Sequence, residues 1–278
     1  MPLRKKFPSE SDPTPDLASY LKKVENIRSK WIDQKALTSR GDEKGIWYRG
    51  QGDSAWGLTP SRWRNDFAEE LESEIRLEFE SVGRQLVSSD AQRDKWGWYF
   101  LMAHYGAPTR LLDWTVNPLV ALYFAVSSCK PDADAAVWVI DPWRWNKVHI
   151  PGLSGPALPG WEETKPYLWD LEASMDTDNA DVRRKWPIAI EPPHIDRRIT
   201  VQEGRFILFG TARDLVASPN VNRRTKKGKK ARLDKILIPH KMANTIRDEL
   251  DRLCINDKTL FPDLAGLGQY IRWKWASF

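Results

Sequence analysis

The stretch Leu101–Val126, "LMAHYGAPTRLLDWTVNPLVALYFAV", decides the fold. Its first half concentrates five polar side chains within ten residues: His104, Tyr105, Thr109, Arg110 and Asp113. Gly106 and Pro108 predict that a helix ends there and that "TRLLDWT" forms a short strand. Asn117 or Thr115 can then cap a helix with Pro118 in its first turn. That helix is apolar on nearly every side, so we expect it to lie at the centre of the core with polar groups gathered beside it.

The flanking sequence predicts an α+β protein with a single domain. Apolar residues spaced three or four apart indicate helices at 14–31 (capped by Thr14), 66–87, 91–103 and 240–254, with a last helix near the C-terminus. Strands are expected at 45–50, 135–142 and 233–239, while 197–210 suggests a strand, a turn at Glu203–Gly204 and a second strand or short helix. No glycine-rich fingerprint follows any strand, which argues against a doubly wound nucleotide fold.

The composition is that of a globular cytoplasmic protein. The 278 residues are 41% hydrophobic and 29% charged, and they include two cysteines. No run of 18 apolar residues exists, so we expect no membrane span. The N-terminal residues lack the apolar region of a secretory signal. Neither Cys129 nor Cys254 has a partner at metal-ligand spacing, and no HExxH pattern occurs, so we expect no metal.

The basic character of the chain is local. The net charge is +5. Removing the seven basic residues of "RRTKKGKKAR" leaves 5 − 7 = −2 for the rest of the chain. Such a segment either contacts a polyanion such as RNA or DNA or simply stays solvated. The candidate nucleic-acid contacts are Arg223, Arg224, Lys226, Lys227, Lys229, Lys230 and Arg232.

Arg49 is the first candidate site residue. It follows Tyr48 in the strand "GIWYRG", whose alternation places Trp47 and Arg49 on one face. A guanidinium beside a large aromatic ring needs an anion, which is either a carboxylate of the protein or a phosphate of a ligand. Gly50 allows a second backbone or a ligand to approach closely.

His104 and the "VQEGRF" segment are the next candidates. His104 either interacts with the C-terminus of its helix or acts as a general base or hydrogen-bond donor. Arg110 and Asp113 can pair with each other and fix the turn between them. Gln202 and Glu203 either orient a sugar hydroxyl from the edge of a strand or occupy an exposed turn.

Taken together, these segments resemble a known family. "WYRGQ", "LTPSRWR", "AHYGAPTRLLDWTVNPLVALYFA", "VQEGRFILFG", "LDKILIP" and "TLFPDLAGL" are similar to the bacterial FRG domain, whose Phe/Tyr-Arg-Gly signature is Tyr48-Arg49-Gly50 here. The resemblance divides the chain into an N-terminal helical extension at 1–40 and an FRG domain at 41–278.

The order of motifs is similar to that of ADP-ribosyltransferases, and this similarity implies a mixed β-sheet core of that fold with NAD as substrate. By this analogy Arg49, His104, Gln202 and Glu203 are catalytic. Tyr48, Gly50, Tyr105, Thr109, Arg110, Asp113 and Thr115 would bind NAD, with Tyr105 or Trp47 stacking on nicotinamide. The late Glu-x-Glu pattern of those enzymes is absent, so the resemblance leaves three candidates for the catalytic acid, Gln202, Glu203 and Asp113, and His104 or Asp113 would share its work.

The resemblance implies a toxin or anti-phage effector that modifies a nucleic acid or a protein and is controlled by an antitoxin or regulator protein. Two alternatives remain open. The same pocket could recognise a nucleotide or nucleic acid without turnover, or His104 and Arg49 could cleave RNA. All three hypotheses require Arg49, His104 and Gln202 or Glu203 to meet at one cleft.

Overall fold

The computed structural model describes residues 14–31, 45–64, 71–87, 94–167, 185–192, 197–221 and 230–276. A six-stranded sheet with the order β4-β5-β2-β1-β3-β6 forms the centre. The α+β class is confirmed, and the ladders between these described strands are all antiparallel where a mixed sheet was expected. The strands are β1 (Trp47–Gln51), β2 (Leu111–Thr115), β3 (Ala135–Ile140), β4 (Ile188–Ile190), β5 (Gly204–Leu208) and β6 (Leu233–Ile238).

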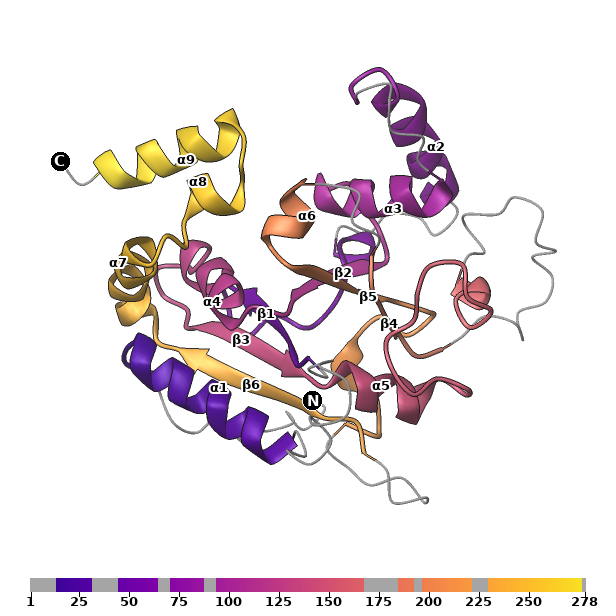
Figure 1. The fold of residues 1–278 in the computed structure, drawn as a ribbon, viewed down its shortest axis with the longest axis horizontal. Helices are drawn as coiled ribbons and strands as arrows, with labels where there is room; N and C mark the ends of the chain where they lie inside the picture. Colours follow the sequence, from indigo (N-terminus) through magenta and orange to yellow (C-terminus); the bar gives the residue numbers. More distant parts are fainter. Residues whose placement is uncertain are drawn as a thin grey trace.

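Helices surround the sheet (Figure 1). They are α1 (Leu17–Trp31), α2 (Glu72–Gly83), α3 (Lys95–His104), α4 (Pro118–Ser127), α5 (Pro142–His149), α6 (Arg197–Val201), α7 (Ala243–Arg252), α8 (Asp257–Leu260) and α9 (Leu264–Trp275). Short 3₁₀ helices occur at Ser61–Trp63, Lys165–Tyr167, Leu215–Ala217 and His240–Met242.

Two helical groups cover different halves of one sheet face. Tyr48, Val137 and Ile236 of β1, β3 and β6 belong to one buried cluster with residues of α1, α4 and α7. Phe206 of β5 belongs to a second buried cluster with Phe100 and other residues of α3. In Figure 1, α4 and α7 accordingly lie beside β1 and β3, while α3 lies over β2 and β5. A seam between the two groups therefore runs over β1 and β2.

Tryptophans dominate the opposite face. Trp47 of β1, Trp114 of β2 and Trp138 of β3 pack there with Trp145 of α5. Because successive side chains of a strand alternate between faces, Tyr48 lies on the other side of the sheet from its neighbour Trp47. This confirms the alternation expected for "GIWYRG".

The central helix begins as its sequence predicts. Asn117 caps α4, and its Oδ1 accepts hydrogen bonds from the amides of Leu119 at 3.0 Å and Val120 at 3.4 Å. Pro118 stands at the first helical position. Thr115, the other candidate cap, accepts from the Asn117 amide at 3.0 Å instead.

The sequence expectation was wrong for residues 197–201, which form helix α6 rather than a strand. The β-branched residues of "RRITV" favour a strand locally, but Ile199 is the only buried residue of this segment, which packs beside β5 and α8. Tertiary packing therefore overrides the weak strand propensity. Glu203 then adopts a φ of 49° and reverses the chain into β5, so the left-handed residue of this turn is Glu203 rather than Gly204.

The N-terminal helix is part of the same core. Asp16, not Thr14, caps α1 by accepting from the Ser19 amide at 2.7 Å. Tyr20 is fully buried, and its hydroxyl donates to the Pro118 carbonyl of α4 at 2.8 Å. The helix expected in the 1–40 extension thus packs on the sheet together with the central helix.

The expected apolar stripe of α2 is only partly buried. Ile75 and Phe79 pack against the cluster under α3, whereas Val82 is 55% and Leu86 82% exposed. No helix among the described residues has the length and apolar character needed to cross a lipid bilayer.

Candidate functional site

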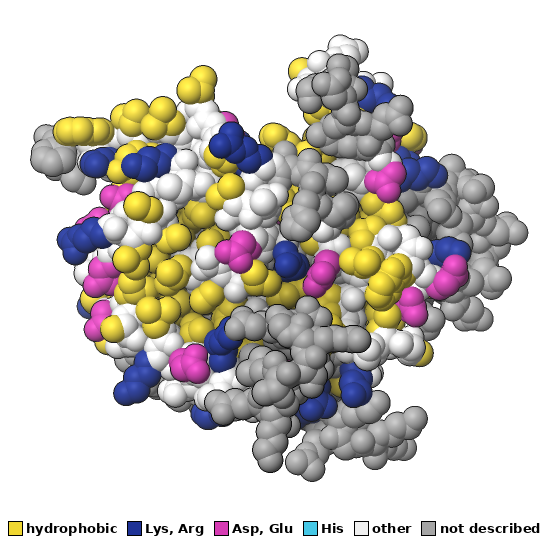
Figure 2. All heavy atoms as spheres, viewed as in Figure 1, with side chains coloured by type: hydrophobic (Ala, Val, Ile, Leu, Met, Phe, Trp, Pro, Cys, Tyr) yellow, Lys and Arg dark blue, Asp and Glu magenta, His cyan; other side chains and the backbone are white. Residues whose placement is uncertain are grey.

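A cavity of about 320 Å³ opens where the seam crosses β1 and β2. The space-filling view shows the surface indented between α2 and the C-terminal α8–α9 segment, above this seam (Figure 2). The cavity is lined by Tyr48, Arg49, Gly50, Gln51, Trp56, Arg64, Ala103, His104, Asp113, Trp114, Thr115, Ala121, Phe124, Ser128, Ile199, Gln202, Gly204, Arg205, Phe206 and Phe261. Residues from four distant parts of the chain therefore converge on one space.

The cavity lies where β1 and β2 stop pairing. All five residues of β1 pair with β3, but Tyr48–Thr115 is the single pair between β1 and β2. Beyond that pair, the Arg49 guanidinium occupies the opening, and its Nη1 donates to the Asp113 carbonyl at 2.6 Å. A side chain thus satisfies a backbone oxygen that a regular ladder would satisfy with an amide.

Gly50 is required by the central helix. A Cβ added there would lie 2.0 Å from the Ala121 carbonyl oxygen and 2.5 Å from the Ala125 nitrogen of α4. The close backbone approach expected at Gly50 is therefore confirmed, with α4 as the approaching element. This contact fixes Arg49, the preceding residue, relative to α4.

The charged form of Arg49 is destabilised by burial and by the nearby Arg64. Burial lowers the pKa of Arg49 to about 10, the Asp113 carboxylate partly opposes that shift, and Arg64 adds to the lowering. The carboxylate is a weak partner, because it lies 3.8 Å from Nη1 and its side chain is 57% exposed. The buried Nε of Arg49 has no hydrogen-bond partner within the part of the chain that the structure describes. The site therefore has unused capacity for an anion.

Arg64 increases that capacity. It is exposed, lines the same cavity, and forms no ion pair or side-chain hydrogen bond within the described part of the chain. Two guanidinium groups facing one cavity hold an anion such as a phosphate more strongly than either group alone.

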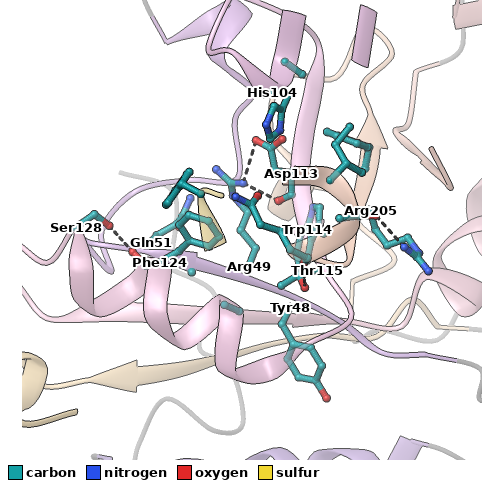
Figure 3. Close-up of a pocket in the computed structure, with 18 of the residues that line it drawn as sticks. Tyr48, Arg49, Gln51, His104, Asp113, Trp114, Thr115, Phe124, Ser128 and Arg205 are labelled. Carbon is teal, nitrogen blue, oxygen red and sulfur yellow. Dashed lines mark hydrogen bonds and ion pairs between the residues drawn. The ribbon is translucent and has the colours of Figure 1, made fainter. Parts of the chain in front are cut away.

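Asp113 and His104 face Arg49 across the opening. Figure 3 shows the His104 ring pointing toward the Asp113 carboxylate, with the Arg49 guanidinium directly beside it. His104 is the last residue of α3, and the Tyr105 ring lies edge-on to it with centroids 5.3 Å apart. Among the described residues lining the cavity, Asp113 is the one carboxylate.

The expected pairing of Arg110 with Asp113 is wrong. Arg110 is buried, and its Nε donates to both oxygens of Glu72 at 3.0 Å. Its other nitrogens donate to the carbonyls of Phe209 and Tyr167, each at 2.7 Å. Arg110 therefore joins α2, β2 and the segment after β5, and it does not line the cavity.

Thr109 also has a structural position. It is fully buried, and its Oγ1 accepts from the Leu111 amide at 3.3 Å. Its carbonyl accepts from the Arg62 amide at 3.1 Å, which joins the Ser61–Trp63 turn to the start of β2. Neither Thr109 nor Arg110 is thus placed to touch a ligand in the cavity.

Gln202 and Glu203 separate at the turn. Gln202 lines the cavity, and its Nε2 donates to the Leu260 carbonyl of α8 at 3.0 Å. Its own carbonyl accepts from Thr115 Oγ1 at 2.7 Å, so Thr115 joins β2 to the end of α6. Glu203 is exposed outside the cavity and accepts from Asn117 Nδ2 at 3.2 Å.

The aromatic residues at the site differ from those expected. Tyr105 is 57% exposed outside the cavity with the Arg198 guanidinium 5.3 Å from its ring centre, and Trp47 is buried in the opposite face. Tyr48 contributes to the lining, but its side chain points away from Arg49 and Asp113 (Figure 3). Phe124 of α4 and Phe261 after α8 instead meet edge-to-face at 6.0 Å and form an apolar wall.

Sequence reasoning missed most of the other lining residues, among them Gln51, Trp56, Arg64 and Phe261. Arg64 and Phe261 lie in the conspicuous segments "LTPSRWR" and "TLFPDLAGL", which were therefore a usable signal. Gln51 is buried, and its amide group is satisfied there. It accepts from Trp138 Nε1 at 2.7 Å and donates to the Gly57 carbonyl at 3.1 Å. These contacts depend on the β1–β3 register and could not be read from local sequence.

Most of the basic segment lies outside the described residues. This applies to Arg223, Arg224, Lys226, Lys227 and Lys229. Lys230 is exposed, whereas Arg232 turns inward to Asp141 at 3.4 Å and to the Trp31 carbonyl. Arg232 therefore has a structural contact. No group of three or more His, Cys, Asp or Glu side chains is placed to hold a metal within the described ranges.

Comparison with known proteins gives one family. The FRG domain model matches residues 44–134, about a third of the chain. Neither curated proteins nor solved structures gave a match. The matched region contains β1, the Ser61–Trp63 turn, α3, β2 and α4, together with Arg49, Arg64, His104 and Asp113. The elements around Arg49 thus come largely from this region, and residues 44–134 match the FRG domain.

Proposed function

We propose that this protein is an NAD-dependent ADP-ribosyltransferase. The observation that supports this most is Arg49, a largely buried guanidinium whose Nε has no hydrogen-bond partner among the described residues, in one cavity with the exposed Arg64. A pyrophosphate is the kind of anion that such a pair binds bidentately. The resemblance of the motif order to ADP-ribosyltransferases supplies the choice of NAD among pyrophosphate ligands.

The cavity dimensions suit one end of a dinucleotide. Ligand pockets commonly enclose roughly 300–1,000 Å³, and 320 Å³ lies at the lower limit. The edge-to-face pair of Phe124 and Phe261 offers an apolar wall for a heteroaromatic ring. We therefore expect Arg49 and Arg64 to hold the phosphates while the remainder of NAD lies along the open mouth.

Asp113 is the carboxylate that the reaction requires. The glycosidic bond between nicotinamide and ribose C1′ breaks, and neutral nicotinamide leaves with the bonding electrons. The oxocarbenium-like ribose is stabilised by a nearby carboxylate. An oxygen or nitrogen of the acceptor then bonds to C1′ and gives up its proton, which Asp113 or His104 is placed to accept. Glu203 lies outside the cavity and has no role in this scheme.

The target and the biological setting follow from the resemblance alone. We place the activity in the bacterial cytoplasm, as a toxin or anti-phage effector whose acceptor is a nucleic acid or a protein. Such an enzyme requires control, which an antitoxin or regulator protein would supply.

The test follows transfer of label from adenylate-labelled NAD to RNA, DNA or lysate protein. The wild type should label one acceptor class, whereas Asp113→Asn, Arg49→Met and His104→Gln should lose transfer while keeping a cooperative thermal transition. Asp248→Asn is the matched control, because Asp248 is an exposed carboxylate on α7 away from the cavity. Absence of transfer to every class of acceptor would refute the proposal.

A second candidate is a nucleotide-binding module without turnover. The observation that favours it is the exposure of Asp113, because a carboxylate that is 57% exposed stays hydrated and stabilises a developing positive charge only weakly. Tight NAD binding without transfer would establish this function. Cleavage of RNA in the absence of NAD would instead indicate a nuclease acting through His104 and Arg49.

A further inference from the structure

Trp56 stands at the rim of the cavity. It lines the cavity and is 41% exposed, so part of its ring is open to solvent. The Lys130 ammonium lies 4.7 Å from the ring centre and is not among the residues that line the cavity. The indole therefore contacts both the Lys130 ammonium and the cavity.

The turn that carries Trp56 is fixed by several hydrogen bonds. Asp53 accepts from the Ala55 amide at 2.9 Å and from Lys130 Nζ at 3.2 Å. The Ser54 carbonyl accepts from Lys235 Nζ at 3.1 Å, and the Ser54 amide donates to the Asp134 carbonyl at 2.7 Å. An exposed indole on so constrained a turn is organised in advance to receive a flat partner.

The same turn is connected to the floor of the cavity. Buried Gln51 donates to the Gly57 carbonyl, the residue after Trp56, at 3.1 Å. Figure 3 shows Gln51 and Ser128 at one end of the cavity, Arg205 at the other, and Arg49 with Asp113 between them. A group resting on Trp56 therefore approaches the reacting centre from the Gln51 end.

The available positive charge at the rim of the cavity suits an anionic ligand. Lys130 is neutralised by Asp53, so the charge available for a ligand comes from Arg64. An aromatic ring and a guanidinium that line one cavity are the combination that binds single-stranded nucleic acids, with one base stacked and one phosphate paired. A peptide held as an added strand would instead need an exposed sheet edge, and β1 lies inside the sheet.

We propose that Trp56 and Arg64 form the acceptor subsite of the transferase and bind an unpaired nucleobase and its phosphate in a single-stranded nucleic acid. This subsite rests on the proposed function for its role as acceptor, but its affinity for nucleic acid does not depend on turnover. The base stacks on the exposed part of the Trp56 ring at the cavity, and one of its oxygens or nitrogens then faces ribose C1′ of the donor.

The experiment measures two affinities on the same variants of the full chain. Anisotropy of fluorescent ten-nucleotide single-stranded RNA and DNA reports the acceptor side, and calorimetry with NAD reports the donor side. Trp56→Ala should weaken binding of the oligonucleotide by about 5- to 150-fold, the range for loss of one stacked base. Trp56→Phe should recover most of that loss, because a smaller ring still stacks.

Trp161→Ala is the matched control, since Trp161 is 44% exposed and does not line the cavity. It should change neither affinity. A loss for Trp56→Ala that is at least fivefold larger for the oligonucleotide than for NAD supports the subsite. The relative strength of the RNA and DNA arms identifies which nucleic acid is bound.

Three results would overturn the subsite: no oligonucleotide binding by the wild type, an equal affinity in Trp56→Ala, or a loss confined to NAD. The failure of the proposed function has a different signature. Oligonucleotide binding that depends on Trp56, in a protein that neither binds nor consumes NAD, would refute the transferase while upholding the aromatic subsite.

Discussion

Replacing Arg49 with methionine separates a ligand-binding arginine from a structural one. Methionine keeps most of the length of the side chain but removes its charge. Burial lowers the pKa of Arg49 from its ordinary value to about 10, and at 1.36 kcal/mol per unit this charge costs the empty protein up to about 3 kcal/mol. The substitution relieves that cost and loses one charge-assisted hydrogen bond, worth about 1.5–3 kcal/mol.

The expected net effect is a variant that is as stable as the wild type or about 2 kcal/mol more stable. For a chain of this size the melting temperature should rise by roughly 0–6 °C. Asp113 does not reverse this result, because its 57% exposed carboxylate stays hydrated after the arginine is removed. Saturating NAD at 100 times Kd should stabilise the wild type by about 2.7 kcal/mol and leave the variant unchanged.

Arg232→Met supplies the contrast within the same protein. Arg232 pairs with Asp141, and the two side chains are only 19% and 14% exposed. Removing this arginine leaves the largely buried Asp141 carboxylate without its cationic partner, which costs up to about 3–5 kcal/mol. Differential scanning calorimetry should therefore show a clear fall in melting temperature for Arg232→Met and none for Arg49→Met. A comparable fall in both would refute the interpretation of Arg49 as a ligand-binding group.

Four further predictions concern the scaffold and the basic segment. Gly50→Ala should destabilise the protein by about 3 kcal/mol or more in denaturant titration, because its Cβ would lie 2.0 Å from the Ala121 carbonyl oxygen; a change below 1 kcal/mol would contradict the close approach. Glu72→Gln should cost about 3–5 kcal/mol in the same assay, since it leaves two buried arginines without their carboxylate; an unchanged midpoint would argue against the ion network. Burial lowers the pKa of His149 to about 4, so the free energy of unfolding should fall by at most about 3 kcal/mol as pH drops from 6.5 to 4, and His149→Gln should flatten that slope; an identical slope would exclude His149 as its source. Replacing the five basic residues within 223–229 by serine should weaken RNA binding and reduce the dependence of that affinity on salt concentration. An unchanged salt dependence would show that the segment does not contribute to RNA binding.

The sequence by itself determined the local elements wherever the signals were short-range. Asn117 and Pro118 start α4, and Gly106, with a φ of 80°, follows the end of α3. These predictions held because caps, prolines and glycines act within one turn of the chain. The prediction from sequence failed at "RRITV", where the local preference for a strand is too weak to resist packing beside β5 and α8.

Only the tertiary structure decided which polar residues share the cavity. Arg110 and Asp113 are three residues apart, yet one is buried against Glu72 and the other faces Arg49, because β2 lies between α3 on one side and the opening next to β1 on the other. Arg49 and Gln202 line the same cavity although 153 positions separate them in the chain. They come together because β1 and β5 are both neighbours of β2 in the sheet. Strand order is fixed by how the entire core packs, and no local pattern encodes it.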